Sequence, residues 1–123
     1  MMIKGLGLSE TKDYISEYDK GVEKTTWKIG VLDSDIFDLV GGNVLNRLSA
    51  MTEVVRFGLK GFANFKDNSG NEITFHTTNR IIGAVTYKIV ADSIMKVIPP
   101  EIKYELANEI IKLSQLSEQE IKN

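Results

Sequence analysis

The stretch Asp92-Ser-Ile-Met-Lys-Val-Ile-Pro-Pro-Glu101 decides how the last third of this chain folds. Residues 92–98 predict a short helix. Pro99-Pro100 ends it, because proline has no amide hydrogen and restricts the backbone of the residue before it. A longer helix is expected from Glu101 onward. The two prolines also fix the angle at which this helix leaves, so we predict a rigid, helical C-terminal third.

The expected C-terminal helix carries an apolar stripe whose members lie four, four and three residues apart. They are Ile102, Leu106, Ile110 and Leu113. Such a stripe is most often part of a core. With Ile111 and Leu116 beside it, however, the helix has more apolar surface than one small sheet needs, and exposed apolar patches mark interfaces. Core and interface both stay open as interpretations. Ser117-Glu-Gln-Glu120 also has the form of a capping box that would start a last short turn.

Two stretches upstream of this helical end predict β-strands. Residues 25–32 alternate in polarity and place Trp27, Ile29 and Val31 on one face. Residues 84–90 are rich in β-branched side chains, which favour the extended backbone. We therefore expect a strand in each stretch.

Between these strands lies the strongest hairpin signal of the chain. Residues 62–66 and 72–76 flank Asp67-Asn-Ser-Gly-Asn71. This five-residue segment is rich in side chains that accept a left-handed backbone. The pattern predicts two strands joined by a tight turn.

Two further helices are expected before the hairpin. Asp33-Ser-Asp35 supplies residues that begin helices, and Gly41-Gly42 supplies a stop. A second helix is expected to begin near Thr52-Glu53 and to end at Gly58 or Gly61.

Residues 1–20 stand apart from these elements. Residues 9–20 are polar with interspersed aromatic side chains, so we predict an arm or a marginal helix there. Residues 21–123 are predicted to form a single α+β domain. It contains a small antiparallel sheet with a central hairpin, packed by helices, and a helical C-terminal third. The residues expected to be mostly buried are Trp27, Phe37, Phe57, Phe62, Phe65, Phe75, Leu106 and Ile110.

The composition suits one globular domain. The chain has 123 residues, 42% hydrophobic and 26% charged, with a formal net charge of −2. This balance argues against nucleic acid as the main partner, since phosphate binding needs clustered lysine and arginine.

Cysteine is absent, which excludes a disulfide framework and a thiolate site. No apolar run approaches the roughly 20 residues of a membrane span. Met1-Met-Ile-Lys-Gly5 carries no secretory signal, so we expect a cytoplasmic protein without a membrane partner.

Three features could carry chemistry, and each has a simpler structural explanation. His76 is the one histidine, and no metal-binding spacing surrounds it. Residues 67–72 resemble a calcium loop but lack the acidic ligand expected about six residues after the glycine. Gly58-Leu-Lys-Gly61 has the form of the G-x-x-G clamp of KH domains, yet a helix end followed by a tight turn is favoured. We therefore predict a protein that is not an enzyme, with no cofactor, no metal site and no small-molecule substrate.

Three regions of the chain resemble small morphogenesis and virion proteins of tailed bacteriophages. The first joins Thr11-Lys-Asp-Tyr-Ile-Ser-Glu-Tyr-Asp to Thr26-Trp-Lys-Ile-Gly-Val-Leu-Asp. The second joins Val55-Arg-Phe-Gly-Leu-Lys-Gly-Phe-Ala-Asn-Phe-Lys-Asp to Gly70-Asn-Glu-Ile-Thr-Phe. The third runs from Pro100-Glu-Ile through Glu105-Leu-Ala-Asn-Glu-Ile and Leu113-Ser-Gln-Leu-Ser-Glu-Gln-Glu to Lys122-Asn123. Some proteins of this kind are tail assembly chaperones and others are minor structural components of the particle.

The resemblance implies a non-enzymatic component of a phage particle, present in many copies. Its partners would be other phage structural proteins or copies of itself, in the virion and, during assembly, in the host cytoplasm. The candidate interface comprises Tyr14, Tyr18, Ile102, Leu106, Ile110 and Leu113. One alternative is a transient tail assembly chaperone that is absent from the mature virion. A more distant alternative is a nucleic-acid-binding module that uses Gly58-Leu-Lys-Gly61.

Overall fold

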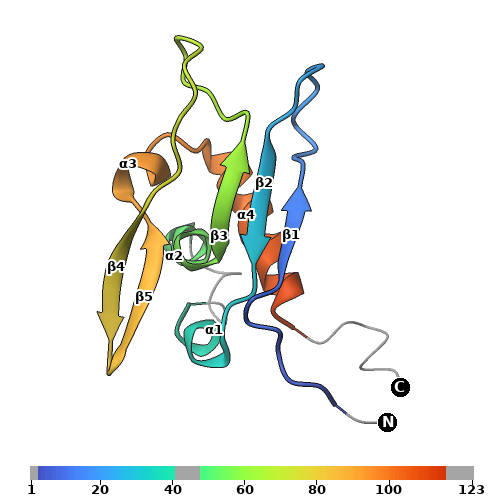
Figure 1. Cartoon of the computed structure of the whole chain (residues 1–123). Coiled ribbons are helices and arrows are strands. Elements are labelled where there is room, and N and C mark those ends of the chain that lie inside the picture. Colours follow the sequence, from blue (N-terminus) through green and yellow to red (C-terminus); the bar gives the residue numbers. More distant parts are fainter. Residues whose placement is uncertain (1–2, 41–47, 116–123) are drawn as a thin grey trace.

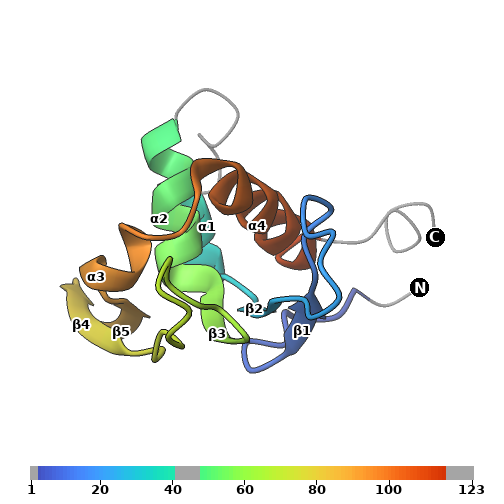
Figure 2. The same cartoon turned by 90° about the horizontal axis from the view of Figure 1, so that it is seen from above.

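The computed structural model describes residues 3–40 and 48–115 and has two layers. Two small antiparallel sheets form one curved layer, and the long helices lie along its concave side (Figures 1 and 2). The predicted α+β class with a helical C-terminal third is therefore confirmed. In chain order the described elements are β1 (Thr11–Tyr14), β2 (Thr26–Gly30), α1 (Ser34–Val40), α2 (Leu48–Gly58), β3 (Leu59–Ala63), β4 (Thr77–Ile82), β5 (Val85–Val90), α3 (Asp92–Met95) and α4 (Pro100–Leu113).

The first sheet has the strand order β1-β2-β3. β2 lies within the predicted strand 25–32, and it turns Trp27 and Ile29 toward the helices while Lys28 stays exposed on the other face. Residues 9–20 were predicted to form an arm or a marginal helix, but Thr11–Tyr14 form the edge strand β1. The free edge of β2 pairs with this segment, and local periodicity in the sequence does not reveal such a distant partner.

The second sheet is the hairpin of β4 and β5, whose register runs from Thr77 opposite Val90 to Ile82 opposite Val85. Gly83 opens the two-residue turn with a φ of 62°, a backbone conformation that glycine adopts without a steric penalty. The predicted strand 84–90 is confirmed as β5. Its partner β4 was not predicted.

The predicted hairpin around residues 67–71 is present as a turn, but its flanks are not regular strands. A single bridge joins Lys66 to Glu72. The first flank is interrupted because Asn64 has a left-handed backbone, with a φ of 60°, directly after β3 ends. The ring of Phe65, the next residue, lies 4.8 Å from that of Trp27, measured between centroids. Backbone hydrogen bonds from Ile73 to Phe65 and from Asp67 to Asn71, each 2.9 Å, flank the bridge, so a short ladder beside the turn coexists with aromatic packing against β2.

The helices begin and end close to their predicted positions. α1 follows Asp33, whose carboxylate Oδ1 accepts a hydrogen bond from the amide of Ile36 at 2.8 Å. α2 begins at Leu48, four residues before the predicted Thr52, and ends at Gly58 as predicted. Pro99-Pro100 separates α3 from α4, which begins at Pro100 because proline suits the first helical position. The stop at Gly41-Gly42 and the capping box at 117–120 lie outside the described residues.

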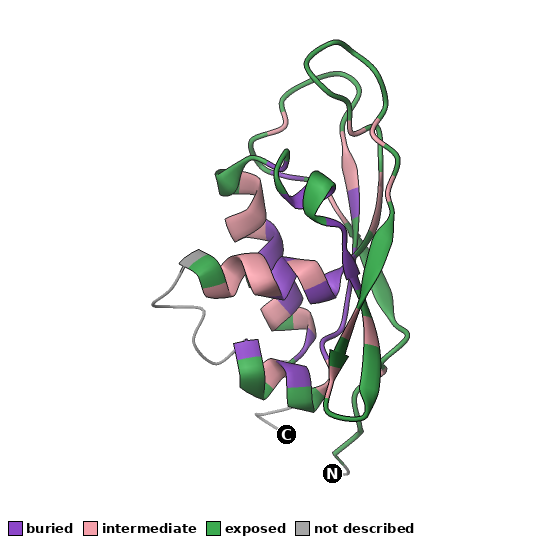
Figure 3. Ribbon diagram, turned by 90° about the vertical axis from the view of Figure 1, so that its left-hand side faces the viewer, coloured by how far each residue is buried: buried purple, intermediate pink, exposed green. Residues whose placement is uncertain are grey.

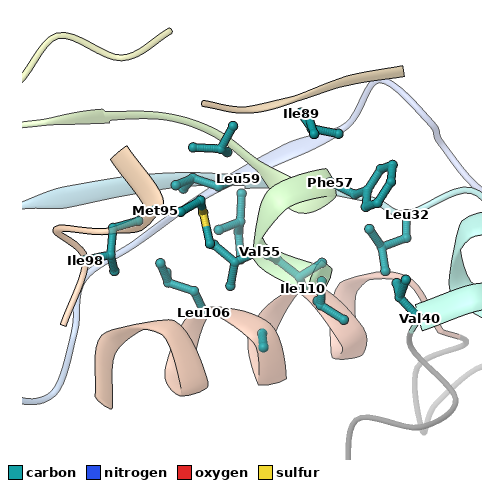
Figure 4. Close-up of a cluster of buried hydrophobic side chains, with 14 of the residues drawn as sticks. Leu32, Val40, Val55, Phe57, Leu59, Ile89, Met95, Ile98, Leu106 and Ile110 are labelled. Atoms are coloured by element: carbon teal, nitrogen blue, oxygen red, sulfur yellow. The ribbon is translucent and has the colours of Figure 1, made fainter. Parts of the chain in front are cut away.

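The core lies between the helix layer and the sheets (Figures 3 and 4). Of the residues predicted to be mostly buried, Trp27, Phe57, Leu106 and Ile110 are buried. Phe37, Phe62, Phe65 and Phe75 are only partly buried and pack around the edge of the core. The fully buried side chains that the prediction omitted are mostly β-branched or leucine: Ile29, Leu32, Ile36, Val54, Val55, Val90 and Ile94.

Gly58 allows α2 and α4 to approach each other closely. A Cβ atom at this position would lie 2.5 Å from Cγ2 of Ile110, which real contacts do not allow. We predict that Gly58→Ala lowers the free energy of unfolding by about 1–3 kcal/mol, since overpacking a dense core forces side chains and backbone to shift. Urea denaturation would measure the loss.

Gly61→Ala is the matched control for this prediction. The nearest atom to its added Cβ would be Cβ of Lys28, at an ordinary contact distance of 3.9 Å. We expect this variant to stay within about 0.5 kcal/mol of the parent. Equal losses in the two variants would show that helix contact is not what requires glycine at position 58.

Candidate functional site

The structure places the centre of the predicted interface inside the core. Leu106 and Ile110 are fully buried, with 0% of their surface exposed, because α2 covers this face of α4 (Figure 4). In this fold their side chains therefore belong to the core of the single chain and not to an exposed surface. Ile102 and Leu113 are partly buried and pack against the same core. The apolar stripe of α4 is the contact between two helices of one chain.

The two predicted tyrosines have different environments. Tyr14 is half-buried on β1, and its hydroxyl donates a hydrogen bond to Oε2 of Glu105 at 2.9 Å. Tyr18 lies in the connection between β1 and β2 and is 65% exposed. The structure thus does not bring the six predicted residues together on one surface. Of these residues, Tyr18 is the one that is largely exposed.

Glu105 of α4 holds β1 and the connection that follows it. Besides Tyr14, its carboxylate accepts a short hydrogen bond from the hydroxyl of Ser16 and another from the amide of Glu17 at 3.1 Å. Nζ of Lys12, on β1, lies 3.8 Å from Oε2 of Glu109, which is one turn further along α4 than Glu105. Burial and the adjacent Glu105 carboxylate raise the pKa of Tyr14 well above its usual range. These contacts are structural, and no sequence spacing links residue 14 to residue 105.

The hairpin of β4 and β5 has an exposed outer edge. β4 lies at the margin of the molecule, and within the described residues it pairs with β5 alone (Figure 1). The side chains of Ile81 and Val85, beside the turn, are 72% and 50% exposed. Arg80 attaches the inner face to α2. Its Nη1 donates a hydrogen bond to Oε2 of Glu53 at 2.6 Å, and its Cζ lies 5.5 Å from the ring centroid of Phe57. The hairpin is therefore firmly attached along one face and open along one edge.

A pocket of about 200 Å³ lies where β3 begins beside β5. Its walls come from the start of the chain, the segment after β2, α1, the end of α2 and the two strands. The lining residues are Leu8, Val31, Leu32, Asp33, Ile36, Phe57, Lys60, Tyr87 and Lys88. Three of them, Leu32, Ile36 and Phe57, are buried members of the core. The pocket thus has an apolar floor and charged groups among its other walls.

Polar contacts position the charged groups of this pocket. Tyr87 donates its hydroxyl hydrogen to Oδ2 of Asp33 at 2.9 Å, and this bond to the carboxylate raises the pKa of Tyr87. Lys60 donates from Nζ to the carbonyl oxygen of Phe57 at 2.9 Å, and so binds one of the last carbonyls of α2. Burial of the Lys60 ammonium lowers its pKa. The sequence had identified Asp33 only as a helix-start residue.

The motifs considered for catalysis and metal binding make local contacts in the described chain. Nδ1 of His76 lies 3.2 Å from the carbonyl of Thr74, and Nε2 lies 3.3 Å from Oγ of Ser93. Asp67 accepts from the amides of Ser69 and Asn71, so its carboxylate closes the turn. Among residues 3–40 and 48–115, no group of three acidic or histidine side chains is placed to hold a metal ion. No helix described here is long and apolar enough to cross a membrane.

The G-x-x-G element is a direct junction of helix and strand. α2 ends at Gly58 and β3 begins at Leu59, so the expected tight turn between them is not formed. Lys60 is turned back onto α2 by its bond to the Phe57 carbonyl.

A comparison of the chain with protein-family models, curated proteins and solved structures finds no match. The resemblance to phage proteins thus rests on the three sequence regions described above.

The raised pKa of Tyr14 predicts a loss of stability at high pH. A tyrosine in the unfolded chain ionises near pH 10, whereas the folded protein keeps this proton to a higher pH. The stabilising contribution is complete below about pH 10 and is lost as the pH rises toward the folded pKa. We expect the free energy of unfolding, measured by urea titration, to fall less steeply between about pH 10 and pH 12 in Tyr14→Phe.

Tyr18→Phe is the control, because this tyrosine is 65% exposed and, among the described residues, its hydroxyl makes no bond to a carboxylate. It should keep the slope of the parent protein. If Tyr14→Phe and Tyr18→Phe have the same dependence on pH, the bond between Tyr14 and Glu105 does not govern the alkaline transition.

Proposed function

We propose that this chain is a non-enzymatic structural or assembly component of a tailed bacteriophage particle and acts through protein–protein contacts. The phage setting rests on the resemblance in sequence. The contact function rests on one structural observation, the open edge of the β4–β5 hairpin. Its partners are other structural proteins of the particle or copies of the same chain.

The edge of β4 offers backbone groups to another chain. The carbonyl of His76 accepts from the amide of Ala91, and pairing alternates along an antiparallel ladder. The amides of Thr77, Asn79 and Ile81 therefore point away from β5. An unpaired row of this kind is a template for the addition of a strand from a partner.

β4 lacks the features that commonly protect a sheet edge. It is six residues long, and its charged side chain, Arg80, is bound to Glu53 on the inner face. β1, the edge strand of the other sheet, has only four residues and exposes the charged side chain of Asp13. Short length and charge discourage pairing with other chains. The comparison between the two edges favours β4 as the contact strand.

The hairpin is also organised before any partner binds. The ring of Tyr87 on β5 lies 5.7 Å from that of Phe57 in an edge-to-face arrangement, measured between centroids. Ile89 and Val90 are buried in the core. A strand held in this way loses little conformational entropy on binding, which leaves more of the interaction energy for affinity.

The assignment to a particle predicts that the chain is present in purified virions. We expect mass spectrometry of finished particles to find a reproducible number of copies per major capsid protein. Abundance in infected cells together with absence from particles would instead support the transient chaperone. Absence from both would overturn the proposal.

If β4 is the contact strand, Ile81→Lys should reduce incorporation into particles at least about tenfold. A factor of ten corresponds to about 1.4 kcal/mol of binding free energy, and burying an unpaired charge at a contact strand costs more than that. Asn79→Pro should act in the same direction, because it removes an amide from the free edge. Both variants are checked for folding by circular dichroism and thermal unfolding. Quantitative mass spectrometry of particles gives the incorporation.

Val97→Lys is the matched control, since Val97 is an exposed apolar residue, 49% accessible, between α3 and α4 and outside the hairpin. It should be incorporated like the parent chain. Normal incorporation of Ile81→Lys and Asn79→Pro would exclude β4 as the contact strand without excluding the protein from the particle.

A further inference from the structure

The pocket beside the start of β3 combines an apolar floor with an excess of positive charge. Two of its lining residues are cationic, Lys60 and Lys88, and one is anionic, Asp33. The carboxylate of Asp33 is already engaged, since Oδ1 accepts from the amide of Ile36 and Oδ2 from the hydroxyl of Tyr87. The ammonium groups are therefore the polar groups with the most remaining capacity to bind.

We infer that this pocket binds a small organic carboxylate, with its apolar body on the floor formed by Leu32, Ile36 and Phe57 and its carboxylate at Lys60 and Lys88. This site is separate from the outer edge of β4, and the inference does not depend on the proposed assembly function. The two can fail independently.

Lys60 has hydrogen-bond donors left for a ligand. An ammonium group carries three donors, and Lys60 uses one of them on the carbonyl of Phe57. This bond also fixes the place of the group at the end of α2. Within residues 3–40 and 48–115 it has no carboxylate partner, and its partial burial disfavours its charged form, as the lowered pKa indicates. An anion bound there would restore the missing electrostatic partner.

Lys88 is available for the same ligand. It is exposed on β5, and it makes no ion pair or hydrogen bond with another described side chain. Tyr87, its neighbour in sequence, presents its hydroxyl to Asp33. Because repulsion from Asp33 disfavours a second carboxylate nearby, the ligand carboxylate is directed toward the two lysines.

The size of the pocket limits the ligand. Pockets for drug-sized molecules commonly measure about 300–1,000 Å³, whereas this one measures about 200 Å³. A single ring or a short aliphatic chain with one carboxylate matches this volume and polarity. Benzoate is a suitable probe, and benzyl alcohol is its neutral counterpart of similar shape.

The experiment titrates the full chain with sodium benzoate and, separately, with benzyl alcohol, and follows amide chemical shifts by NMR. We expect saturable benzoate binding with shifts confined to the segments that line the pocket, and binding of benzyl alcohol at least about tenfold weaker. Loss of a hydrogen bond to a charged group corresponds to about tenfold or more in affinity. Lys88→Met should therefore weaken benzoate binding by that factor.

Lys60→Met should weaken binding further, but it also removes the bond to the Phe57 carbonyl and could disturb the fold. Lys88→Met, which leaves that bond in place, keeps the test decisive. Lys28→Met, an exposed lysine of β2 outside the pocket lining, is the matched control and should bind benzoate like the parent. The inference is overturned by absence of saturable binding, by equal affinity for the two probes, or by unchanged affinity in Lys88→Met.

Discussion

The contact between α2 and α4 is the constraint on which the rest of the structure depends. A glycine at position 58 lets the helices approach until Ile110 occupies the space of the missing side chain. This approach buries the stripe of α4 against Val54 and Val55. α2 continues directly into β3, and α4 follows β5 after one short helix. The packing of one helix pair therefore determines where both sheets lie.

Polar contacts attach each sheet to a different helix. Ser114, just after α4, accepts from the amide of Leu32 at 2.9 Å and donates to the carbonyl of Ile110 at 2.7 Å. Glu105 holds the β1 side of the first sheet to α4, whereas Arg80 holds the hairpin to α2 through Glu53. β3 and β5 consequently belong to separate sheets. The pocket lies where they meet, because no ladder closes that space.

The two proposed binding sites share one support. The ring of Phe57 contacts Tyr87 of the hairpin, its side chain lines the pocket, and its carbonyl holds Lys60. Phe57 is itself buried at the end of α2. The open edge of β4 and the pocket are thus placed by the same residue, although they offer different chemistry: unpaired backbone groups on one side, and ammonium groups above an apolar floor on the other.

Local patterns in the sequence determined the α+β class, β2, β5, the start of α1 after Asp33 and the break at Pro99-Pro100, because these depend on neighbouring residues. Only the tertiary structure decided which surfaces are free. The stripe of Leu106 became core because α2 covers it, and a polar N-terminal segment became β1 because β2 offered an edge. Two hydrogen bonds join residues far apart in the chain, one from the Tyr87 hydroxyl to Asp33 and one from the Tyr14 hydroxyl to Glu105. The periodicity of the sequence predicts which side of a helix or strand is apolar. Which other helix or strand packs on that side depends on how the whole chain folds.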